Sequence, residues 1–222
     1  MHLFIVEGDY LAAEFRRKFG PAHTYDFCSA TDPDLLVRLA AADVAFDLRA
    51  WPELHYEQPR QPLFYHTTSQ TLARLFRGEA LPFGPVFGFC ALPTLLDRPL
   101  LEISVYRPED AALLAPLAAS LGTAYCVVQD RVGLVTPRVV CMAINEACHA
   151  LQEGLASIGD IERAIKQATT AAYGPFEWAT RIGVDRVYET LEALYQDTHD
   201  DRYRIAPLLK TMFLRGQSFL LE

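Results

Sequence analysis

The chain has 222 residues, of which 51% are hydrophobic and 22% charged, and its formal net charge is −8 at pH 7. This length and composition predict a globular protein of one large domain or two small ones. The acidic balance argues against a general nucleic-acid binder, because such a protein needs a basic face for phosphates. One local cluster of Arg or Lys could still bind a small anionic ligand.

The sequence shows no segment for export or membrane insertion. Met1–Asp9 is too short an apolar run for a signal peptide and lacks a basic leader, and no stretch reaches the roughly 20 apolar residues that cross a bilayer. The five cysteines include no CxxC pair, and most lie in apolar runs typical of buried free thiols. We therefore predict a cytoplasmic protein with no membrane association and no metal site.

The first half of the chain alternates predicted strands with predicted helices. Strands are expected at His2–Glu7, His23–Cys28, Asp43–Leu48, Pro62–Tyr65, Val86–Ala91, Leu100–Val105 and Ala124–Gln129. Helices are expected at Tyr10–Phe19, Asp32–Ala41, Ser69–Phe76 and Pro108–Leu121. Asp32 is the expected N-cap of its helix, with Pro33 at the first helical position, and Gly122 is the expected stop of the last helix. This alternation predicts a mainly parallel sheet with helical crossovers.

After Asp130 the sequence predicts helices only, so we place a domain boundary near Gln129–Val132 and expect domains of residues 1–130 and 131–222. The expected helices are Pro137–Gln152, Ser157–Ala172, Pro175–Ile182, Val184–Tyr195 and Ala206–Leu214. Ser157 and Asp160 match a capping box. The first of these helices has an apolar face formed by Val139, Met142, Ala143, Ala147, Ala150 and Leu151. The second half is therefore expected to be an all-α helical bundle.

A series of short motifs lies in order along the second half. They are Asp130-Arg131-Val132-Gly133-Leu134, Asn145-Glu146-Ala147, Gly154-Leu155-Ala156-Ser157 with Asp160-Ile161, Gly174-Pro175-Phe176-Glu177, Ile182-Gly183-Val184-Asp185, and Arg202-Tyr203 through Pro207-Leu208-Leu209. In this order they resemble the 3-hydroxyacyl-CoA dehydrogenase family. The resemblance implies an α/β Rossmann-like domain followed by a helical domain that dimerises and helps to bind acyl-CoA. The first domain is shorter than in the family, and the helical insertion after the second strand is absent.

The resemblance also locates the dinucleotide loop, which the family uses for NAD. The loop needs glycines so that the backbone can approach the pyrophosphate at a helix N-terminus. Here one glycine remains, Tyr10 adds bulk, and two carboxylates add negative charge. Asp26, in the second strand, is a poor substitute for the ribose-binding acid. We therefore expect no bound NAD. The degenerate positions are Glu7, Gly8, Asp9 and Ala12.

In the family a His held by a Glu moves the proton of the hydroxyl–ketone pair, and Ser and Asn orient the substrate. An ungapped alignment on Glu102 places Cys90 at the His position. The two Asn positions hold Pro93 and Pro137, and Ser69 falls on the Ser position within one residue. The titratable base of the family's acid–base chemistry is therefore missing from its expected place.

Two residues could take over the chemistry. Cys90 could act as a nucleophile, but its neighbours are apolar, which favours a buried unreactive thiol. His66 could lie at the carboxyl edge of the sheet, where open α/β folds bind ligands, although a loop histidine without a catalytic role is the plainer interpretation. Glu102, without its His, is expected to pair with Arg98 or to be exposed.

The helical half offers further candidates for ligand binding. Its scattered arginines could contact CoA phosphates, but such arginines usually pair with neighbouring acids; they are Arg181, Arg186, Arg202 and Arg204. Trp178 is expected in the core or at a dimer contact rather than as a platform for substrate.

Three functions follow from these observations. The main hypothesis is a non-catalytic, dimeric family member that keeps a pocket for acyl-CoA or another small anionic ligand. The second is an active 3-hydroxyacyl-CoA dehydrogenase-related oxidoreductase, or an enzyme of altered chemistry that uses Cys90, His66 or Ser69. The third is an assembly module in which the dimer itself is the function. We expect a homodimer through Pro137–Gln152, because of its apolar face and because two-fold contacts are the commonest kind.

Overall fold

The computed structural model describes residues 1–50, 59–169 and 171–220. The chain forms two compact units. One contains residues 1–91 and 95–134, and we call it the sheet unit; the other contains residues 92–94 and the chain from Val135 onward, and we call it the helical unit. The change from one unit to the other falls between Leu134 and Val135.

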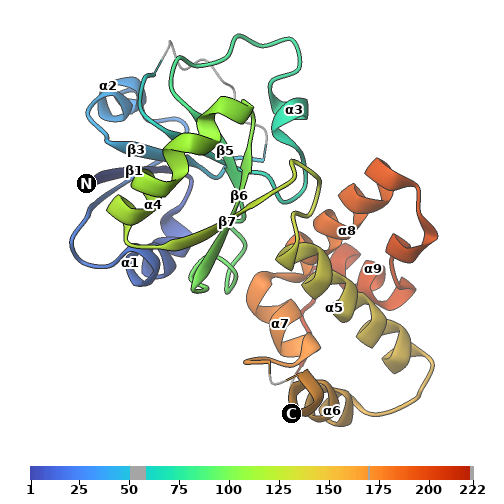
Figure 1. The fold of residues 1–222 in the computed structure, drawn as a ribbon. Coiled ribbons are helices and arrows are strands. Elements are labelled where there is room, and N and C mark those ends of the chain that lie inside the picture. The colour runs from blue at the N-terminus through green and yellow to red at the C-terminus, as the bar shows by residue number, and fades with distance from the viewer. Residues whose placement is uncertain (51–58, 170, 221–222) are drawn as a thin grey trace. The chain divides into compact units, whose positions relative to one another are not determined.

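The sheet unit is built on one sheet, in which the described residues form seven strands in the order β2-β1-β3-β4-β5-β6-β7 (Figure 1). The strands are β1 His2–Val6, β2 Thr24–Cys28, β3 Val44–Asp47, β4 Leu63–His66, β5 Val86–Phe89, β6 Leu100–Val105 and β7 Ala124–Val128. Neighbouring strands are parallel, except that β5 and β6 are antiparallel. The predicted Rossmann-like fold with a mainly parallel sheet is confirmed.

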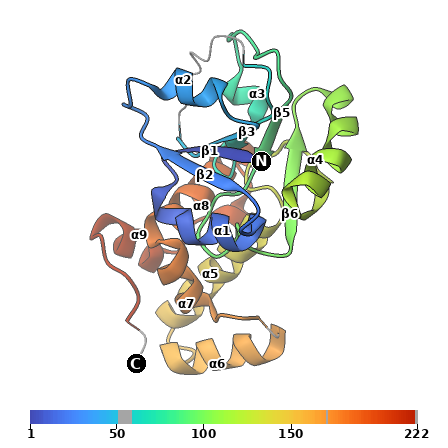
Figure 2. The ribbon, with the colours of Figure 1, turned by 90° about the vertical axis from the view of Figure 1, so that its left-hand side faces the viewer.

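Helices cover both faces of this sheet (Figures 1 and 2). On one face, α1 (Ala12–Phe19) and α4 (Leu114–Leu121) pack through Phe15 and Leu114 against strand residues such as Phe46. On the other face, α2 (Leu35–Ala40) and α3 (Leu72–Leu75) pack against Phe4 and Tyr65. Each fully buried side chain of this size contributes roughly 1.5–3 kcal/mol. The sheet unit therefore has an apolar core on both faces, and its strand ends are held in fixed positions.

The start of α2 differs from the prediction. The helix begins at Leu35 after Asp34, so Asp32 is not its N-cap and Pro33 lies before the helix. The Asp32 carboxylate instead accepts a hydrogen bond from the Asp34 N–H and forms an ion pair with Arg38. Both contacts favour the charged carboxylate, and they hold the pKa of Asp32 below its usual value.

Two other predicted helices of the sheet unit are shorter than expected. The helix predicted at Ser69–Phe76 begins only at Leu72, because Thr71 caps it and its hydroxyl accepts a hydrogen bond from the Arg74 N–H at 3.1 Å. The helix predicted at Pro108–Leu121 starts as a 3₁₀ turn, Pro108–Leu113, before α4. A second 3₁₀ turn, Asp9–Leu11, precedes α1. The predicted stop at Gly122 is confirmed, with a left-handed φ of 70°.

The helical unit contains α5 Thr136–Gln152, α6 Ile158–Thr169, α7 Pro175–Ile182, α8 Val184–Thr198 and α9 Pro207–Leu214, with a 3₁₀ turn at Asp201–Tyr203. The long helix α5 packs against α7, α8 and α9 (Figure 1). Ser157 caps α6 as predicted, because its hydroxyl accepts a hydrogen bond from the Asp160 N–H at 3.2 Å, while the Asp160 carboxylate accepts from the Ser157 hydroxyl. Residue 170, within the helix predicted at Ser157–Ala172, lies outside the described residues. The predicted helical bundle is confirmed.

Candidate functional site

The loop after β1 is built around the side chain of Glu7. Its carboxylate accepts hydrogen bonds from the Ala30 N–H at 2.7 Å and from the Ser29 hydroxyl at 3.2 Å, both in the segment that follows β2. Glu7 has a left-handed φ of 55°, which is uncommon for a residue with a side chain. A carboxylate therefore connects the segments that follow β1 and β2.

The other residues of this loop lead from β1 into α1. Gly8 precedes the 3₁₀ turn, Asp9 opens it, and the Tyr10 side chain is 51% exposed. Ala12 is the first residue of α1. Asp26, on β2, forms an ion pair with Arg38. The one acid that sequence reasoning considered for ribose binding is therefore engaged in an ion pair with α2.

Cys90 and Glu102 are neighbours across the antiparallel pair β5–β6. The register pairs Gly88 with Ser104 and Phe89 with Ile103, and its next step pairs Cys90 with Glu102. These two residues take the family's His and Glu positions in the ungapped alignment, and that assignment stays a prediction. Cys90 is 6% exposed and Glu102 is half-buried. Glu102 also pairs with Cys126 of β7, and partial burial together with the charge of Glu102 raises the pKa of that thiol.

His66 ends β4 at the carboxyl edge of the sheet, as expected from the sequence. Its Nδ1 accepts a hydrogen bond from the Ala91 N–H at 2.9 Å and lies 3.4 Å from the Thr68 hydroxyl. His66 pairs with Phe89 in the ladder. Because side chains alternate along a strand, His66 lies on the sheet face of Phe89, whereas Cys90 and Glu102 lie on the opposite face. The structure therefore places His66 beside the end of β5, but not on the same face as Glu102.

The loop after His66 is mostly buried and strongly polar. Thr67 and Thr68 are 0% exposed and Gln70 is 2% exposed, while His66 and Ser69 are half-buried. Within the described residues, the Thr67 hydroxyl and the Gln70 Oε1 have no hydrogen-bond partner. Buried polar atoms without a partner are rare and usually belong to a site that binds water, an ion or a ligand. The loop therefore carries two half-buried residues, His66 and Ser69, among polar residues that are buried.

Asp130 holds this loop, a role that sequence reasoning missed. Its carboxylate accepts hydrogen bonds from the N–H groups of Leu72 and Ala73, at 2.9 and 3.0 Å. The Gly133 N–H donates to the Thr68 carbonyl at 2.7 Å. The first motif of the second half, Asp130 to Gly133, thus fixes the loop that carries His66. Asp130 lies 57 residues from Ala73 along the chain, so no local sequence pattern indicated this contact.

Gly88 lies between two polar side chains on the sheet face that also carries Cys90. A Cβ at Gly88 would lie 2.3 Å from the Ser104 hydroxyl and 2.5 Å from the Thr67 hydroxyl. Both distances are too short for any real Cβ, so a glycine is required here. The absence of a side chain at Gly88 makes room for these two buried hydroxyls on the neighbouring strands.

The helical unit contains the other two altered positions. Pro93 is half-buried, and Pro137 is buried in the first turn of α5. Neither side chain has a hydrogen-bonding group, so neither can replace the orienting amide of an Asn. Trp178 donates its indole N–H to the Thr94 hydroxyl at 3.0 Å, and its ring is near that of Tyr173. Trp178 is therefore engaged in contacts within the helical unit.

The candidate phosphate-binding arginines mostly pair with neighbouring acids, as expected. Arg181 pairs with Glu177, Arg202 with Asp200 and Arg204 with Asp201, at N–O distances of 2.9, 2.6 and 2.8 Å. Arg186 donates to the Ile182 carbonyl at 3.2 Å. These contacts give the arginines local structural roles, so they do not define a phosphate site.

Two side chains in the helical unit hold backbone groups of the motifs. The buried Asn145 amide donates to the Arg204 carbonyl at 3.0 Å and accepts from the Ala206 N–H at 2.9 Å. The Glu162 carboxylate accepts from the Phe176 and Glu177 N–H groups at the start of α7. These contacts explain the motif residues as parts of the helical scaffold.

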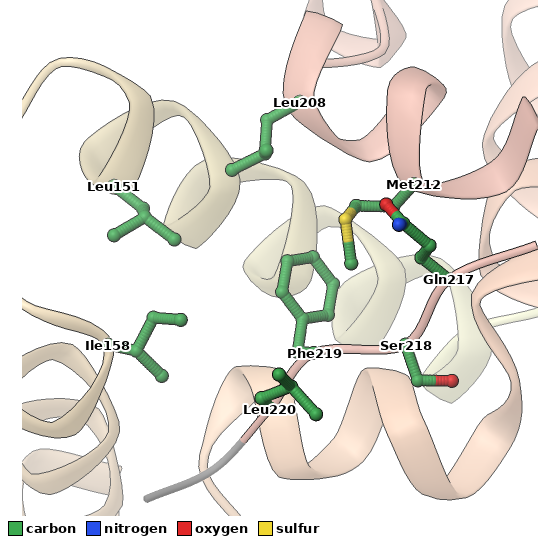
Figure 3. Close-up of a pocket in the computed structure, with 8 residues that line it drawn as sticks. All are labelled: Leu151, Ile158, Leu208, Met212, Gln217, Ser218, Phe219 and Leu220. Carbon is green, nitrogen blue, oxygen red and sulfur yellow. The ribbon is translucent and has the colours of Figure 1, made fainter. Parts of the chain in front are cut away.

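An apolar hollow of about 530 Å³ lies in the helical unit between α5, α6, α9 and the segment after α9 (Figure 3). In Figure 3 the Phe219 ring projects into its middle, with Leu151 and Ile158 on one side and Met212 on the other. No titratable side chain is among the residues that line it, which are Leu151, Ile158, Leu208, Met212, Gln217, Ser218, Phe219 and Leu220. This hollow can therefore receive an apolar group but has no side chain for acid–base chemistry.

Known proteins match this chain most clearly in the helical unit. The family model described as "3-hydroxyacyl-CoA dehydrogenase, C-terminal domain" matches residues 133–218. A 3-hydroxybutyryl-CoA dehydrogenase of Bradyrhizobium diazoefficiens is 33% identical over 185 residues, which are 80% of this chain and 62% of that protein. Residues 133–218 therefore match the C-terminal domain of the 3-hydroxyacyl-CoA dehydrogenase family, and the chain as a whole is similar to these dehydrogenases. A 3-hydroxyadipyl-CoA dehydrogenase of Escherichia coli is 39% identical over 83 residues, 37% of this chain and 18% of that protein.

Solved structures of the family share the fold of both units. FadB2 of M. tuberculosis gives a TM-score of 0.79 at 16% identity, and (S)-3-hydroxybutyryl-CoA dehydrogenase PaaH1 of Ralstonia eutropha gives 0.71 at 20% identity. Both alignments cover 97% of this chain and 94% of the other. Psf3, solved in complex with NADP+, gives 0.60 at 12% identity and covers 96% of this chain and 92% of that one. At these identities the structures support the fold alone.

Two further properties of the family member complete the description. The part of the chain that the structure describes has no group of three or more His, Cys, Asp or Glu side chains placed to hold a metal ion. Among the same residues, no helix has the length and apolar character to cross a membrane.

Proposed function

We propose that this family member binds an acyl-CoA or a related small anionic thioester, and that it does not carry out NAD-dependent hydride transfer. The proposal is carried by Glu7, whose carboxylate lies in the loop where the family's cofactor pyrophosphate is expected. Binding of a thioester is inferred from the printed names of the relatives, which act on 3-hydroxybutyryl-CoA and 3-hydroxyadipyl-CoA.

The residues after β1 do not fit a dinucleotide. A pyrophosphate carries negative charge and needs free backbone N–H groups at the start of the helix. Glu7 and Asp9 place two carboxylates there instead, and negative charge at a helix N-terminus disfavours the binding of an anion at the same place. The Ala30 N–H is also already engaged by Glu7. We therefore derive no reaction step through NAD.

The proton-transfer pair is incomplete as well. The resemblance places Cys90 at the His position, and a thiol lacks the two ring nitrogens with which an imidazole donates and accepts hydrogen bonds. His66 lies on the opposite face of the sheet from Glu102, so it does not restore the pair. These positions support a binding role for the carboxyl edge of the sheet.

The second candidate is an active 3-hydroxyacyl-CoA oxidoreductase, and a specific observation favours it. Each relative named above with an activity is a dehydrogenase, and the chain shares 33% identity with one of them over 185 residues. Glu102 and Ser69 also occupy positions that the resemblance assigns to the reaction. In this case the cofactor would have to be held by residues other than the degenerate loop.

The two candidates are separated by measuring binding and turnover on the same preparation. Acetoacetyl-CoA is titrated calorimetrically, with free CoA as the matched control, and NADH oxidation is followed with acetoacetyl-CoA present. We expect saturable acetoacetyl-CoA binding and NADH consumption equal to that without protein. Protein-dependent NADH oxidation would overturn the proposal and establish the second candidate. If acetoacetyl-CoA does not bind and NADH is not oxidised, both candidates are wrong and the assembly role remains.

We also propose that the chain is a homodimer through α5. The face suggested by the sequence needs revision, because Ala147 is buried inside the helical unit. Val135, Val139 and Ala143 are exposed and lie at successive spacings of four residues, so they form one stripe along the helix.

Sedimentation should show a dimer at micromolar concentration. Val139→Asp should shift it to monomer, whereas Leu214→Asp, a change at an equally exposed position on α9, should not. A monomeric wild-type chain would contradict the proposal.

The five cysteines are free thiols, which supports a reducing, cytoplasmic location. Burial raises the pKa of Cys148 to about 12, so this thiol stays protonated at neutral pH. The proposed function therefore involves no thiol chemistry at that position.

A further inference from the structure

The short segment Leu92–Thr94, which we call the Thr94 turn, follows β5 and contains a residue in an unfavourable backbone conformation. Thr94 has a φ of 66°. A β-branched residue is a genuine outlier at a left-handed φ, whereas a glycine adopts it without steric cost. Conformations of this kind persist only where the surrounding structure holds them, and they are often found at functional positions. The surroundings of Thr94 therefore have to supply the stabilisation that its backbone lacks.

Trp178 supplies part of this stabilisation. Its indole N–H donates a hydrogen bond to the Thr94 hydroxyl at 3.0 Å. Trp178 lies on α7, where Phe176 and Ile182 are 0% exposed, so the donor is carried by a helix that is packed into the helical unit. A glycine at position 94 would relieve the backbone but would have no side-chain acceptor for this N–H. The threonine is thus explained by its hydroxyl and not by its backbone preference.

The strain at Thr94 cannot spread to its neighbours. Pro93 has a fixed φ, and a residue before a proline, here Leu92, is restricted to extended conformations. The chain is anchored on either side of the turn, because Ala91 and Leu96 are 0% exposed in the apolar core of the sheet unit. The change of direction between these anchors therefore falls on Thr94.

The Thr94 turn is connected to His66 through the backbone. The N–H of Ala91, the residue immediately before the turn, donates to His66 Nδ1 at 2.9 Å. Ala91 is buried, so no water can replace the imidazole as the acceptor of this N–H. A turn that relaxed to another conformation would displace Ala91 and lengthen this hydrogen bond.

We infer that Trp178 is a positioning residue for His66. By holding the Thr94 turn in its left-handed conformation, the indole fixes the Ala91 N–H that orients the imidazole at the carboxyl edge of the sheet. This role goes beyond the proposed function, because it concerns the chain without a ligand and holds whichever ligand binds. It makes the orientation of His66 depend on a side chain of the helical unit.

Hydrogen exchange of the Ala91 amide in the full-length protein, followed by NMR, tests this role. Trp178→Phe keeps an aromatic ring and removes the N–H, and Thr94→Val keeps the β-branched shape and removes the acceptor. In each variant we expect the protection of Ala91 to fall about tenfold, because the loss of one hydrogen bond makes local opening easier. The amide of Phe4, on β1, is the control and should stay within about twofold of wild type.

Circular dichroism confirms that the two variants are folded. Unchanged protection of Ala91 in a folded variant would overturn the inference. An equal loss at Ala91 and Phe4 would also overturn it, because it would show general destabilisation of the chain.

A second substitution separates strain at Thr94 from simple loss of packing. When Trp178→Phe is combined with Thr94→Gly, position 94 reaches a φ of 66° without steric cost and no longer needs the indole. We expect the protection of Ala91 to return to within about threefold of wild type. Protection that stays as low as in Trp178→Phe alone would contradict the inference, because packing of α7 would then control Ala91 instead of the backbone of the turn.

The His66 ring is followed in the same samples by its ¹⁵N signals, which are assigned from their loss in His66→Gln. These signals should shift in Trp178→Phe and return in the double variant, while those of His2, on β1, should not move. Identical His66 signals in wild type and Trp178→Phe would show that the indole does not position this ring.

Discussion

The helical unit and the carboxyl edge of the sheet unit differ in how their polar residues are used. In the helical unit, motif residues such as Asn145 bind backbone groups, and Glu162, which no motif contains, does the same. These contacts are independent of any ligand. At the edge of the sheet, Glu7, Cys90 and His66 occupy positions near the ends of strands and differ from the residues that the family resemblance leads one to expect.

This difference shows which residues the fold itself requires. A side chain that completes a helix end or pairs a buried carbonyl stabilises the scaffold whatever the chemistry. A base or a glycine in a cofactor loop contributes to function alone, and it can change without unfolding the chain. Retention in one unit and change in the other is the pattern expected if the scaffold is needed after NAD-dependent chemistry is lost.

The strongest test of the scaffold role concerns Asn145. Asn145→Ala leaves the Arg204 carbonyl and the Ala206 N–H without their partner, and we expect a loss of about 3 kcal/mol in the free energy of unfolding. Urea denaturation followed by circular dichroism measures it. Glu146→Ala, at the exposed neighbouring position, should change the same quantity by no more than about 0.5 kcal/mol. A loss below about 1 kcal/mol for Asn145→Ala would place this motif residue outside the scaffold.

The loop after β1 is tested by comparing two replacements of Glu7. Glu7→Ala and Glu7→Gly both remove the hydrogen bonds to Ser29 and Ala30, but only glycine adopts a φ of 55° without steric cost. We expect Glu7→Gly to be more stable than Glu7→Ala by about 1 kcal/mol. Thermal unfolding of the two variants, side by side, measures the difference. Equal stabilities would mean that the left-handed backbone at this position is not a feature of the protein in solution.

An effect of similar size is expected at the start of α7. A Cβ on Gly174 would lie 1.9 Å from the Glu162 carboxylate, so Gly174→Ala should displace this carboxylate from the N–H groups that it caps. Loss of such a cap costs about 1 kcal/mol, and Glu162→Ala should cost the same. In the Glu162→Ala background, Gly174→Ala should then cost nothing further. Additive losses in this double-mutant cycle would show that the two residues act independently.

Most of the fold could be predicted from local patterns in the sequence. Strand and helix positions followed from hydrophobic alternation, and the Ser157–Asp160 capping box followed from spacing alone. The predicted helix starts were wrong where other groups bind the side chain that was expected to cap the helix. Asp32 has the residue type of an N-cap, but Arg38 and the Asp34 N–H engage its carboxylate before the helix begins. Ser69 is not a helix start, because Thr71 and the distant Asp130 supply the caps.

The candidate site was predictable only in part. The alignment on Glu102 placed Cys90 at the family's His position, and the structure brings the ends of β5 and β6 that carry these residues side by side. The contact of His66 could not be predicted, since its partner, the N–H of Ala91, lies 25 residues away, just beyond the end of β5. Contacts of this kind arise from strand order, and no local spacing encodes them.

The central claim is that the loop after β1 no longer accepts a dinucleotide, and calorimetric titration of NADH into the wild-type chain tests it most directly. We expect no saturable heat, with a dissociation constant weaker than about 1 mM, because Glu7 and Asp9 hold negative charge where the pyrophosphate would lie. Saturable binding with a micromolar dissociation constant would contradict the account and favour an active oxidoreductase.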